Sequence, residues 1–105
     1  MAGGGDPQSA IGAGLAALQA RDPARAAALL REAAAVAGPG EMPWMALAQA
    51  ELVLGNDDAA EVAIDCQLEQ NTRDVGALLF KGKLRERAGD PRAATSCYQA
   101  AVNQA

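Results

Sequence analysis

The amino-acid sequence predicts an all-α fold of three helical hairpins, with six antiparallel helices. The first observation is an internal repeat, because the pattern around Trp44 recurs 34 residues later around Leu78 and starts 34 residues earlier at Ala10. The second is composition, since half of the 105 residues are apolar and many of these are alanine, the strongest intrinsic helix former. The third is an Asp-Pro step that occurs three times and is typical of a helix start.

The first hairpin is delimited by local signals at both of its helices. Asp6 is the expected N-cap, and Pro7 the first helical residue, of a helix over about 7–20. The second helix starts at the next Asp-Pro step and should cover about 23–37, because Gly38 and a proline follow it. The two helices are therefore joined by a connection of only a few residues.

Similar signals delimit the other two hairpins. Their four helices are expected at about 43–54, 57–70, 73–88 and 91–103. Pro43 opens the first of these helices, and Asp57 is a good N-cap residue for the second. Thr72 is the expected cap of the third, and the last begins at the third Asp-Pro step. Gly55 and Gly89 end the first helix of each hairpin.

Equivalent positions of the repeats carry side chains of matched size. Two positions are small throughout: Gly14, Ala48 and Gly82 at one, and Ala26, Ala60 and Ala94 at the other. Small side chains there should let the two helices of a hairpin approach closely. A third position holds Leu30, Ile64 and Tyr98, which should fill the larger space between consecutive repeats. A bulky residue at Ala60 would overpack the hairpin, at a cost of about 1–3 kcal/mol.

The repeat resembles a known family. Its residues are Trp44, Leu47, Ala48, Gly55, Ala60 and Ile64, with their counterparts 34 residues on. This arrangement is similar to the tetratricopeptide repeat (TPR), whose pattern is W-x2-L-G-x2-Y, then A-x3-F, then P, at a 34-residue period. The sequence departs from that pattern at Glu51, Lys81 and Arg85, where the family has tyrosine, leucine and tyrosine. The resemblance implies a right-handed solenoid with repeats at about 7–40, 41–74 and 75–105.

Two further expectations concern the ends of the chain. Residues 1–5 are glycine-rich and are expected to form a disordered tail before a single repeat domain over 6–105. The run from Leu78 to Ala94 is loosely similar to the repeats that precede the catalytic domain of bacterial aspartyl/asparaginyl β-hydroxylase-like proteins. That likeness implies an alternative in which the chain is an N-terminal accessory or oligomerisation domain of a larger oxygenase.

The charge is distributed in blocks. The net charge is −4, yet residues 41–70 hold seven acidic and no basic residues, whereas residues 71–105 hold six basic and three acidic ones. These blocks should attract each other within the stack, and the acids along the fourth helix are otherwise expected to face solvent. An acidic chain lacks the basic footprint of nucleic-acid binding. No apolar run approaches the roughly 20 residues of a membrane helix, and no leader pattern is present. The predicted location is cytoplasmic.

The sequence offers no group of residues for catalysis. It has no histidine and no glycine-rich phosphate loop, and Cys66 and Cys97 lack metal-ligand spacing and a nearby base. Both cysteines are expected to be buried thiols. The prediction is therefore a protein that is not an enzyme, with no catalytic residue, no metal and no cofactor.

The resemblance implies a partner-binding surface instead. In TPR proteins the first helices of successive repeats line a concave groove that holds a peptide or a helix. The repeat register gives the groove residues Ile11, Leu15, Met42, Met45, Gln49, Leu79, Phe80, Lys83 and Arg87. Each apolar member could equally be a core residue. Together they form a Met-rich apolar patch, and a protein surface rarely exposes such a patch unless it binds a partner.

The chemistry of this groove indicates the kind of partner. Ile11, Leu15 and Ala46 stand where chaperone-binding TPR proteins carry a lysine and asparagine clamp, so a C-terminal carboxylate is not the expected ligand. Lys83 and Arg87 are one helical turn apart and would favour acidic residues, although a solvated helix face is the simpler interpretation. The expected occupant is a protein or peptide, as an apolar or acidic-apolar helix. A homodimer through the terminal repeat is the other expectation.

Overall fold

The structure, a computed structural model, describes residues 7–104, and all of its regular secondary structure in that range is helical. The α-helices are α1 (Pro7–Gln19), α2 (Pro23–Ala34), α3 (Trp44–Val53), α4 (Asp57–Gln70), α5 (Val75–Arg87) and α6 (Pro91–Gln104). A single 3-10 turn, η1 (Pro39–Glu41), precedes α3. The predicted all-α class with six helices is thus confirmed. The predicted tail at 1–5 and the Asp6 cap lie outside the described residues.

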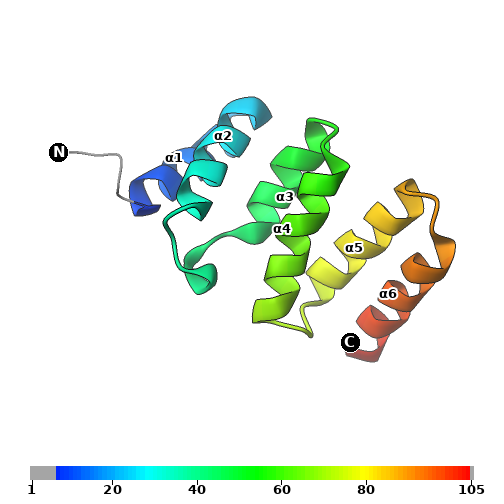
Figure 1. Ribbon diagram of the computed structural model, residues 1–105. Helices are drawn as coiled ribbons and strands as arrows, with labels where there is room; N and C mark the ends of the chain where they lie inside the picture. The colour runs from blue at the N-terminus through cyan, green and yellow to red at the C-terminus, as the bar shows by residue number, and fades with distance from the viewer. Residues whose placement is uncertain (1–6, 105) are drawn as a thin grey trace.

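The helices pack as three hairpins. The most extensive contacts join α1 with α2, α3 with α4, and α5 with α6. Weaker contacts join α2 with α3 and α4 with α5, so each hairpin touches the next one along the chain. Figure 1 shows the hairpins following one another along the long axis of the molecule, which extends 49 × 25 × 20 Å. This arrangement matches the order in which the repeats occur in the sequence.

Helix ends follow most of the predicted signals and correct three of them. Asp22 caps α2 as expected, because its carboxylate accepts a hydrogen bond of 3.2 Å from the amide of Arg25. The N-cap of α5 is Asp74 and not Thr72, since the Asp74 carboxylate accepts from the amide of Ala77 at 3.1 Å. The same carboxylate also accepts from the side chain of Gln67 at 2.7 Å, which ties the start of α5 to α4.

The other two corrections concern α2 and α4. Helix α2 ends at Ala34, three residues before the predicted end, because Val36 already donates to Ala33 in the tighter 3-10 pattern, at 3.1 Å. Helix α4 has Asn56 at its N-cap, so Asp57 is the first helical residue and not the cap. The side chain of Asn56 donates instead to Glu51, at 2.9 Å.

The core runs through all three hairpins. Its buried apolar residues include Leu30 of the first hairpin, Leu47 and Ile64 of the second and Leu84 of the third. A smaller cluster of alanines, with Ala26 and Ala27 of α2 and Ala50 of α3, sits where the first two hairpins meet. Because alanine carries only one methyl group, this contact holds the helix backbones close together. The core therefore stabilises the order of the hairpins as well as each hairpin.

Candidate partner-binding surface

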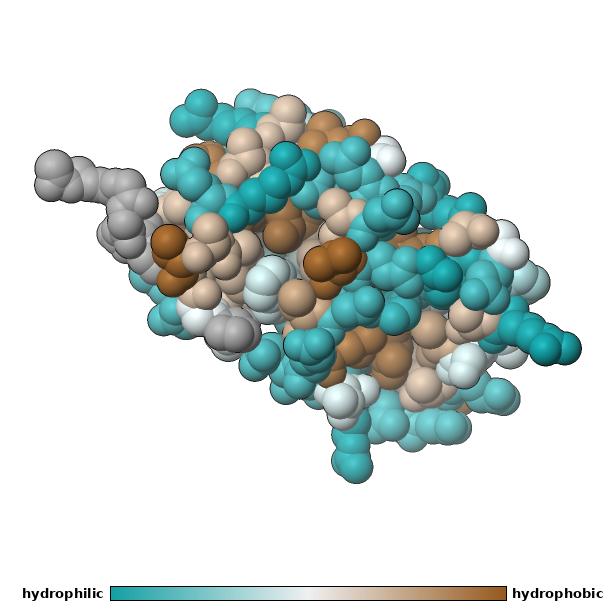
Figure 2. All heavy atoms as spheres, in the orientation of Figure 1, coloured by the Kyte–Doolittle hydropathy of each residue, from teal (hydrophilic) through white to brown (hydrophobic). Residues whose placement is uncertain are grey.

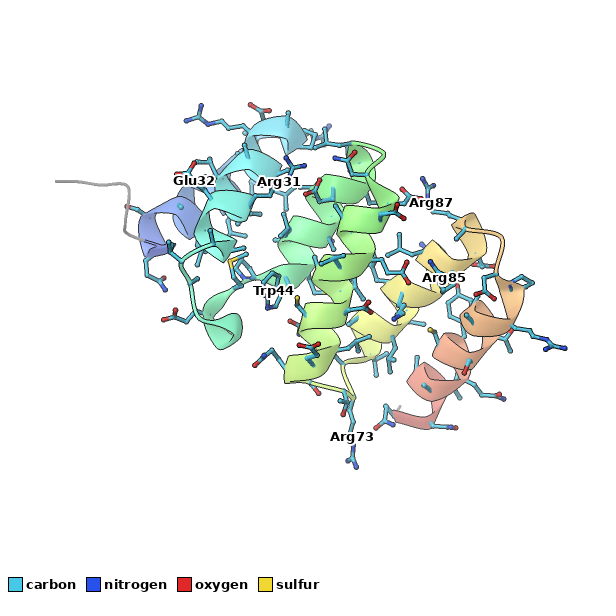
Figure 3. All side chains as sticks on the ribbon, in the orientation of Figure 1. Arg31, Glu32, Trp44, Arg73, Arg85 and Arg87 are labelled. Atoms are coloured by element: carbon cyan, nitrogen blue, oxygen red, sulfur yellow. The ribbon has the colours of Figure 1, made fainter. Side chains whose placement is uncertain are left out.

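Ion pairs join α4 to α5 at three successive positions. Lys81 pairs with Asp65 at 2.5 Å, and Arg85 pairs with Glu61 at 2.5 Å. Arg87 Nε donates to an Asp57 oxygen at 2.8 Å. Figure 3 shows Arg85 and Arg87 on α5 beside α4. The acidic second hairpin is thus fastened to the basic third one, as the charge blocks predicted.

Hydrogen bonding within the pairs shifts the pKa values of Asp57, Arg85 and Arg87. The hydrogen bond from Arg87 holds the pKa of the Asp57 carboxyl below its ordinary value. The Glu61 carboxylate raises the pKa of the Arg85 guanidinium by accepting its hydrogen bond. Both directions favour the charged forms of Asp57 and Arg85.

These three ion pairs correct part of the expectation that the acids of α4 and the bases of α5 face solvent. Glu61 and Asp65 do not simply face water, because both carboxylates are bound by side chains of α5. Arg87 is also held by its pair with Asp57, so its guanidinium is only partly available to a partner. Among the described side chains, none forms an ion pair with Lys83. Of the basic residues of α5, Lys83 is the one open to an incoming acid.

An ion pair with the opposite polarity joins the first two hairpins, and its acid is buried whereas its base is exposed. Glu51 of α3 is 2% exposed, and its two oxygens accept from Arg31 Nε and Nη2 of α2 at 2.6 and 2.5 Å. The hydrogen bonds from Arg31 lower the pKa of Glu51 against the opposing effect of burial, and Asn56 lowers it further. Here the base lies on the earlier hairpin, whereas between the second and third hairpins the acids do. The two interfaces between hairpins therefore have opposite arrangements of acid and base.

The nine predicted groove residues differ widely in exposure. Ile11 and Met42 are buried in the core cluster, so they support the surface without being open to a partner. Met45 and Phe80 are half-buried against that cluster. The remaining five are exposed: Leu15, Gln49, Leu79, Lys83 and Arg87. The accessible part of the predicted groove is therefore smaller and more polar than the sequence suggested.

Three of the exposed members form a row. Leu15, Gln49 and Lys83 occupy the same position of successive repeats on α1, α3 and α5, and all three are exposed. Leu79, 44% exposed, lies one turn before Lys83 on α5. The row changes from apolar at the first hairpin to cationic at the third.

A hollow of about 410 Å³ adds residues that lie outside the nine predicted groove residues. It is lined by Leu18, Arg21, Pro23 and Val53. Val53 is 69% exposed at the end of α3, and Arg21 stands at the turn between α1 and α2 with a positive φ of 62°. The repeat register could have indicated this hollow, because it places Val53 one helical turn after Gln49. The hollow offers an apolar seat beside a cation.

A second apolar hollow lies between α2 and α4. Its volume is about 360 Å³, and its lining includes Ala34, Trp44, Leu47 and Val62. Figure 3 shows Trp44 in the space between these helices, and Figure 2 shows brown and tan side chains gathered there within a hydrophilic surround. The Arg31–Glu51 pair borders the same hollow. Sequence reasoning missed this hollow because it depends on Ala34 being small where the next repeat has Leu68.

Within 7–104 no cluster of three or more metal-ligating side chains occurs. Cys66 and Cys97 are free thiols and are half-buried, whereas the sequence predicted that both are buried. Burial, with the nearby Glu69 and Asp65 charges, raises the pKa of the Cys66 thiol and so disfavours the nucleophilic thiolate. In the same range no helix has the length and hydrophobicity to cross a membrane.

No protein-family model matches the sequence, and no curated protein sequence matches it.

Proposed function

We propose that the chain is a non-catalytic interaction module of the TPR type, a right-handed solenoid of three repeats that binds a partner protein along its first helices. The observation that carries the proposal is the exposed row of Leu15, Gln49 and Lys83 at one repeat position. Side chains at equivalent positions are spaced by the repeat itself, so a single extended or helical segment can contact all three.

The partner is an acidic-apolar segment. Its apolar residues contact Leu79 at the third hairpin and enter the hollow lined by Leu18 and Val53 at the first two. Lys83 supplies an exposed cation, and Arg21 supplies another at the rim of the hollow. An acidic residue near each cation gains a charge-assisted hydrogen bond. Steering by opposite charge also raises the association rate at low salt.

The test begins with a library of displayed helical peptides selected on the full chain. The selected peptides should carry acidic and apolar residues, and ¹⁵N chemical-shift changes on binding should concentrate at Leu15, Gln49, Leu79 and Lys83. Lys83→Glu should weaken binding at least about tenfold, which corresponds to about 1.4 kcal/mol. Leu79→Asp should weaken it by a similar factor, because Leu79 is already exposed and its replacement leaves the fold intact.

The matched control is Val62→Asp. Val62 is 64% exposed on α4 and lines the other hollow, between α2 and α4. This variant introduces the same new charge at a similar exposure, and it should leave peptide affinity unchanged. If Val62→Asp removes binding while Lys83→Glu and Leu79→Asp do not, the partner uses the α2–α4 hollow and the proposal is wrong.

A further inference from the structure

The outer face of α6 repeats a surface that is filled twice elsewhere in the molecule. Inside the structure, α3 packs against α2, and α5 packs against α4. On α6 the corresponding positions form a shallow hollow of about 280 Å³ lined by Thr95, Tyr98, Gln99, Val102 and Asn103. One repeat earlier these positions are Glu61, Ile64, Asp65, Leu68 and Glu69. Glu61 and Asp65 are the residues that bind α5.

Exposure changes at these positions as expected for an unfilled seat. Ala34 on α2 and Leu68 on α4 are half-buried, whereas Val102 at the same position of α6 is 69% exposed. Leu30 and Ile64 are fully buried, whereas Tyr98 is only half-buried. Tyr98 and Val102 are still largely apolar side chains, although the described part of the chain contains no helix that covers them. The face is therefore suited to receive another helix.

The outer face of α1 is the complementary surface. Ala50 of α3 and Leu84 of α5 share one repeat position, and both are buried by the hairpin that precedes them. Ala16 holds that position in α1 and is exposed. Ala13, which corresponds to Leu47 and Lys81, is exposed as well. Helix α1 thus presents the side on which a preceding hairpin would pack.

Charge selects α1 as the helix that fits α6. Each filled interface pairs a charge with its opposite, as in Arg31 with Glu51 and in Lys81 with Asp65. Helix α6 has the neutral Gln99 at the position of Arg31 and Asp65, so a charged helix would be left without a partner there. Helix α1 has no charged residue along its whole length. Helix α1, which is the first helix of its hairpin, therefore matches the neutral surface of α6 around Gln99.

We propose that α6 of one molecule binds α1 of a second copy, with the geometry that joins α4 to α5, so that copies stack head to tail. Such a contact uses two different surfaces and leaves one of each free at the ends of every assembly. It therefore grows into open chains or closes into a ring, and does not stop at a symmetric dimer. The row of Leu15, Gln49 and Lys83 takes no part in it.

The direct test is sedimentation equilibrium of the full chain over a wide concentration range. The weight-average mass should rise from the monomer value of 10.7 kDa past twice that value as concentration increases. A mass that stays at the monomer value throughout overturns the proposal. A mass that levels off at twice the monomer overturns it as well, because that result indicates a symmetric dimer.

Two variants block one end each. Ala16→Arg places a bulky charge on the outer face of α1, and Val102→Arg places one on α6; both sites are exposed, so circular dichroism should show unchanged helix content. Each variant alone should remain monomeric. An equimolar mixture should form a dimer and stop there, because it contains one intact α6 and one intact α1. Association of either variant alone contradicts head-to-tail stacking, and so does a mixture that stays monomeric.

A gain of affinity provides an independent test. Gln99→Asp and Ala13→Lys, made in one chain, recreate at the new contact the pair that Asp65 and Lys81 form inside the molecule. This double variant should associate at a concentration several-fold lower than the original chain, and added salt should reverse the gain. The control is Gln99→Lys with Ala13→Lys, which places like charges together and should associate less than the original chain. Equal behaviour of the two double variants would contradict the proposal.

Discussion

Gly82 of α5 packs directly against the ring of Tyr98 of α6. A methyl group added at Gly82 would lie 2.8 Å from Cδ1 and 2.9 Å from Cζ of that ring, well inside van der Waals contact. The hydroxyl of Tyr98 then donates to a carboxylate oxygen of Glu86 on α5 at 2.5 Å, which fixes the ring across the hairpin and raises the pKa of the phenol. The absence of a side chain at Gly82 is thus what admits the largest residue at this repeat position.

Gly12→Ala should stabilise the protein, whereas Gly82→Ala should leave it less stable than Gly12→Ala does. Both glycines are helical, but a Cβ at Gly12 meets no atom within 4 Å. Gly12→Ala should therefore gain about 1 kcal/mol from helix propensity alone. Gly82→Ala receives the same gain but overpacks Tyr98, so it should fall about 1–3 kcal/mol below Gly12→Ala. Urea unfolding of the two variants measures this difference, and equal stabilities would show that the ring moves freely.

The second hairpin suggests the compensating change. It has Ala48 and Ile64 at the positions of Gly82 and Tyr98, and both are fully buried. Tyr98→Ile should therefore be less harmful in the Gly82→Ala background than in the original chain. The coupling energy in the double-mutant cycle should be about 0.5–3 kcal/mol. Additive effects would indicate that the two positions do not constrain each other.

The sequence predicted the elements that depend on local signals or on the repeat. The six helices, the close approach at Gly82 and the attraction between charge blocks all follow from residues at fixed spacing. The exact ion pairs did not, because Arg31 and Glu51 are 20 residues apart and Arg87 and Asp57 are 30 apart. Such distances leave several acids within reach of each base, and only the packing of the helices decides between them.

Burial within the candidate groove was equally hard to predict. Ile11, Met45 and Leu79 share one repeat position, yet their exposure rises from buried to exposed along the chain. The repeat register fixes which side of the helix a residue is on, whereas its exposure depends on the bulk of the neighbouring hairpin. For the cap of α5, Thr72 and Asp74 both fit the local pattern. The additional bond from Gln67 to Asp74, seven residues away, distinguishes them.

Arg31→Ala should destabilise the protein by about 2 kcal/mol, because it leaves the buried Glu51 carboxylate with Asn56 as its remaining partner. Replacing both residues, as Arg31→Leu with Glu51→Leu, should cost much less, since an apolar pair of similar total volume avoids the burial of a charge. Thermal unfolding of the single and double variants tests this order. A double variant as unstable as Arg31→Ala would show that the pair contributes more than it costs to bury.

Stability should fall in acid because of the same pair. The native pKa of Glu51 is lowered by Arg31, so the native state binds fewer protons than the unfolded state near the ordinary carboxyl pKa. Its contribution is present above that ordinary value and is lost as pH falls through the lowered native pKa. The unfolding free energy should therefore decrease from pH 6 to pH 3, and Glu51→Gln should flatten the decrease. An unchanged slope in Glu51→Gln would assign the acid sensitivity to other carboxylates, such as Asp57.

The Cys66 thiol should react slowly with alkylating reagents. Burial and the neighbouring Glu69 and Asp65 charges raise its pKa, so the thiolate fraction at pH 8 is smaller than in a free thiol. In a Cys97→Ser background, Cys66 should react with iodoacetamide more slowly than glutathione does. In urea its rate should rise to that of glutathione. The additional removal of both charges, as Glu69→Gln with Asp65→Asn, should increase the native rate. A native rate equal to that in urea would mean that Cys66 is fully accessible.

Reversal of one ion pair should disrupt the contact between the second and third hairpins, and its exchange should restore it. Lys81→Asp places three carboxylates together, since Asp65 and Glu61 both face α5. The melting temperature should fall, and high salt should recover part of the loss by screening the repulsion. Adding Asp65→Lys re-forms a pair of the opposite polarity, the one that Arg31 and Glu51 already show at the other interface. If the exchanged pair is no more stable than Lys81→Asp alone, then Lys81 stabilises the hairpin contact through the packing of its alkyl chain and not through its charge.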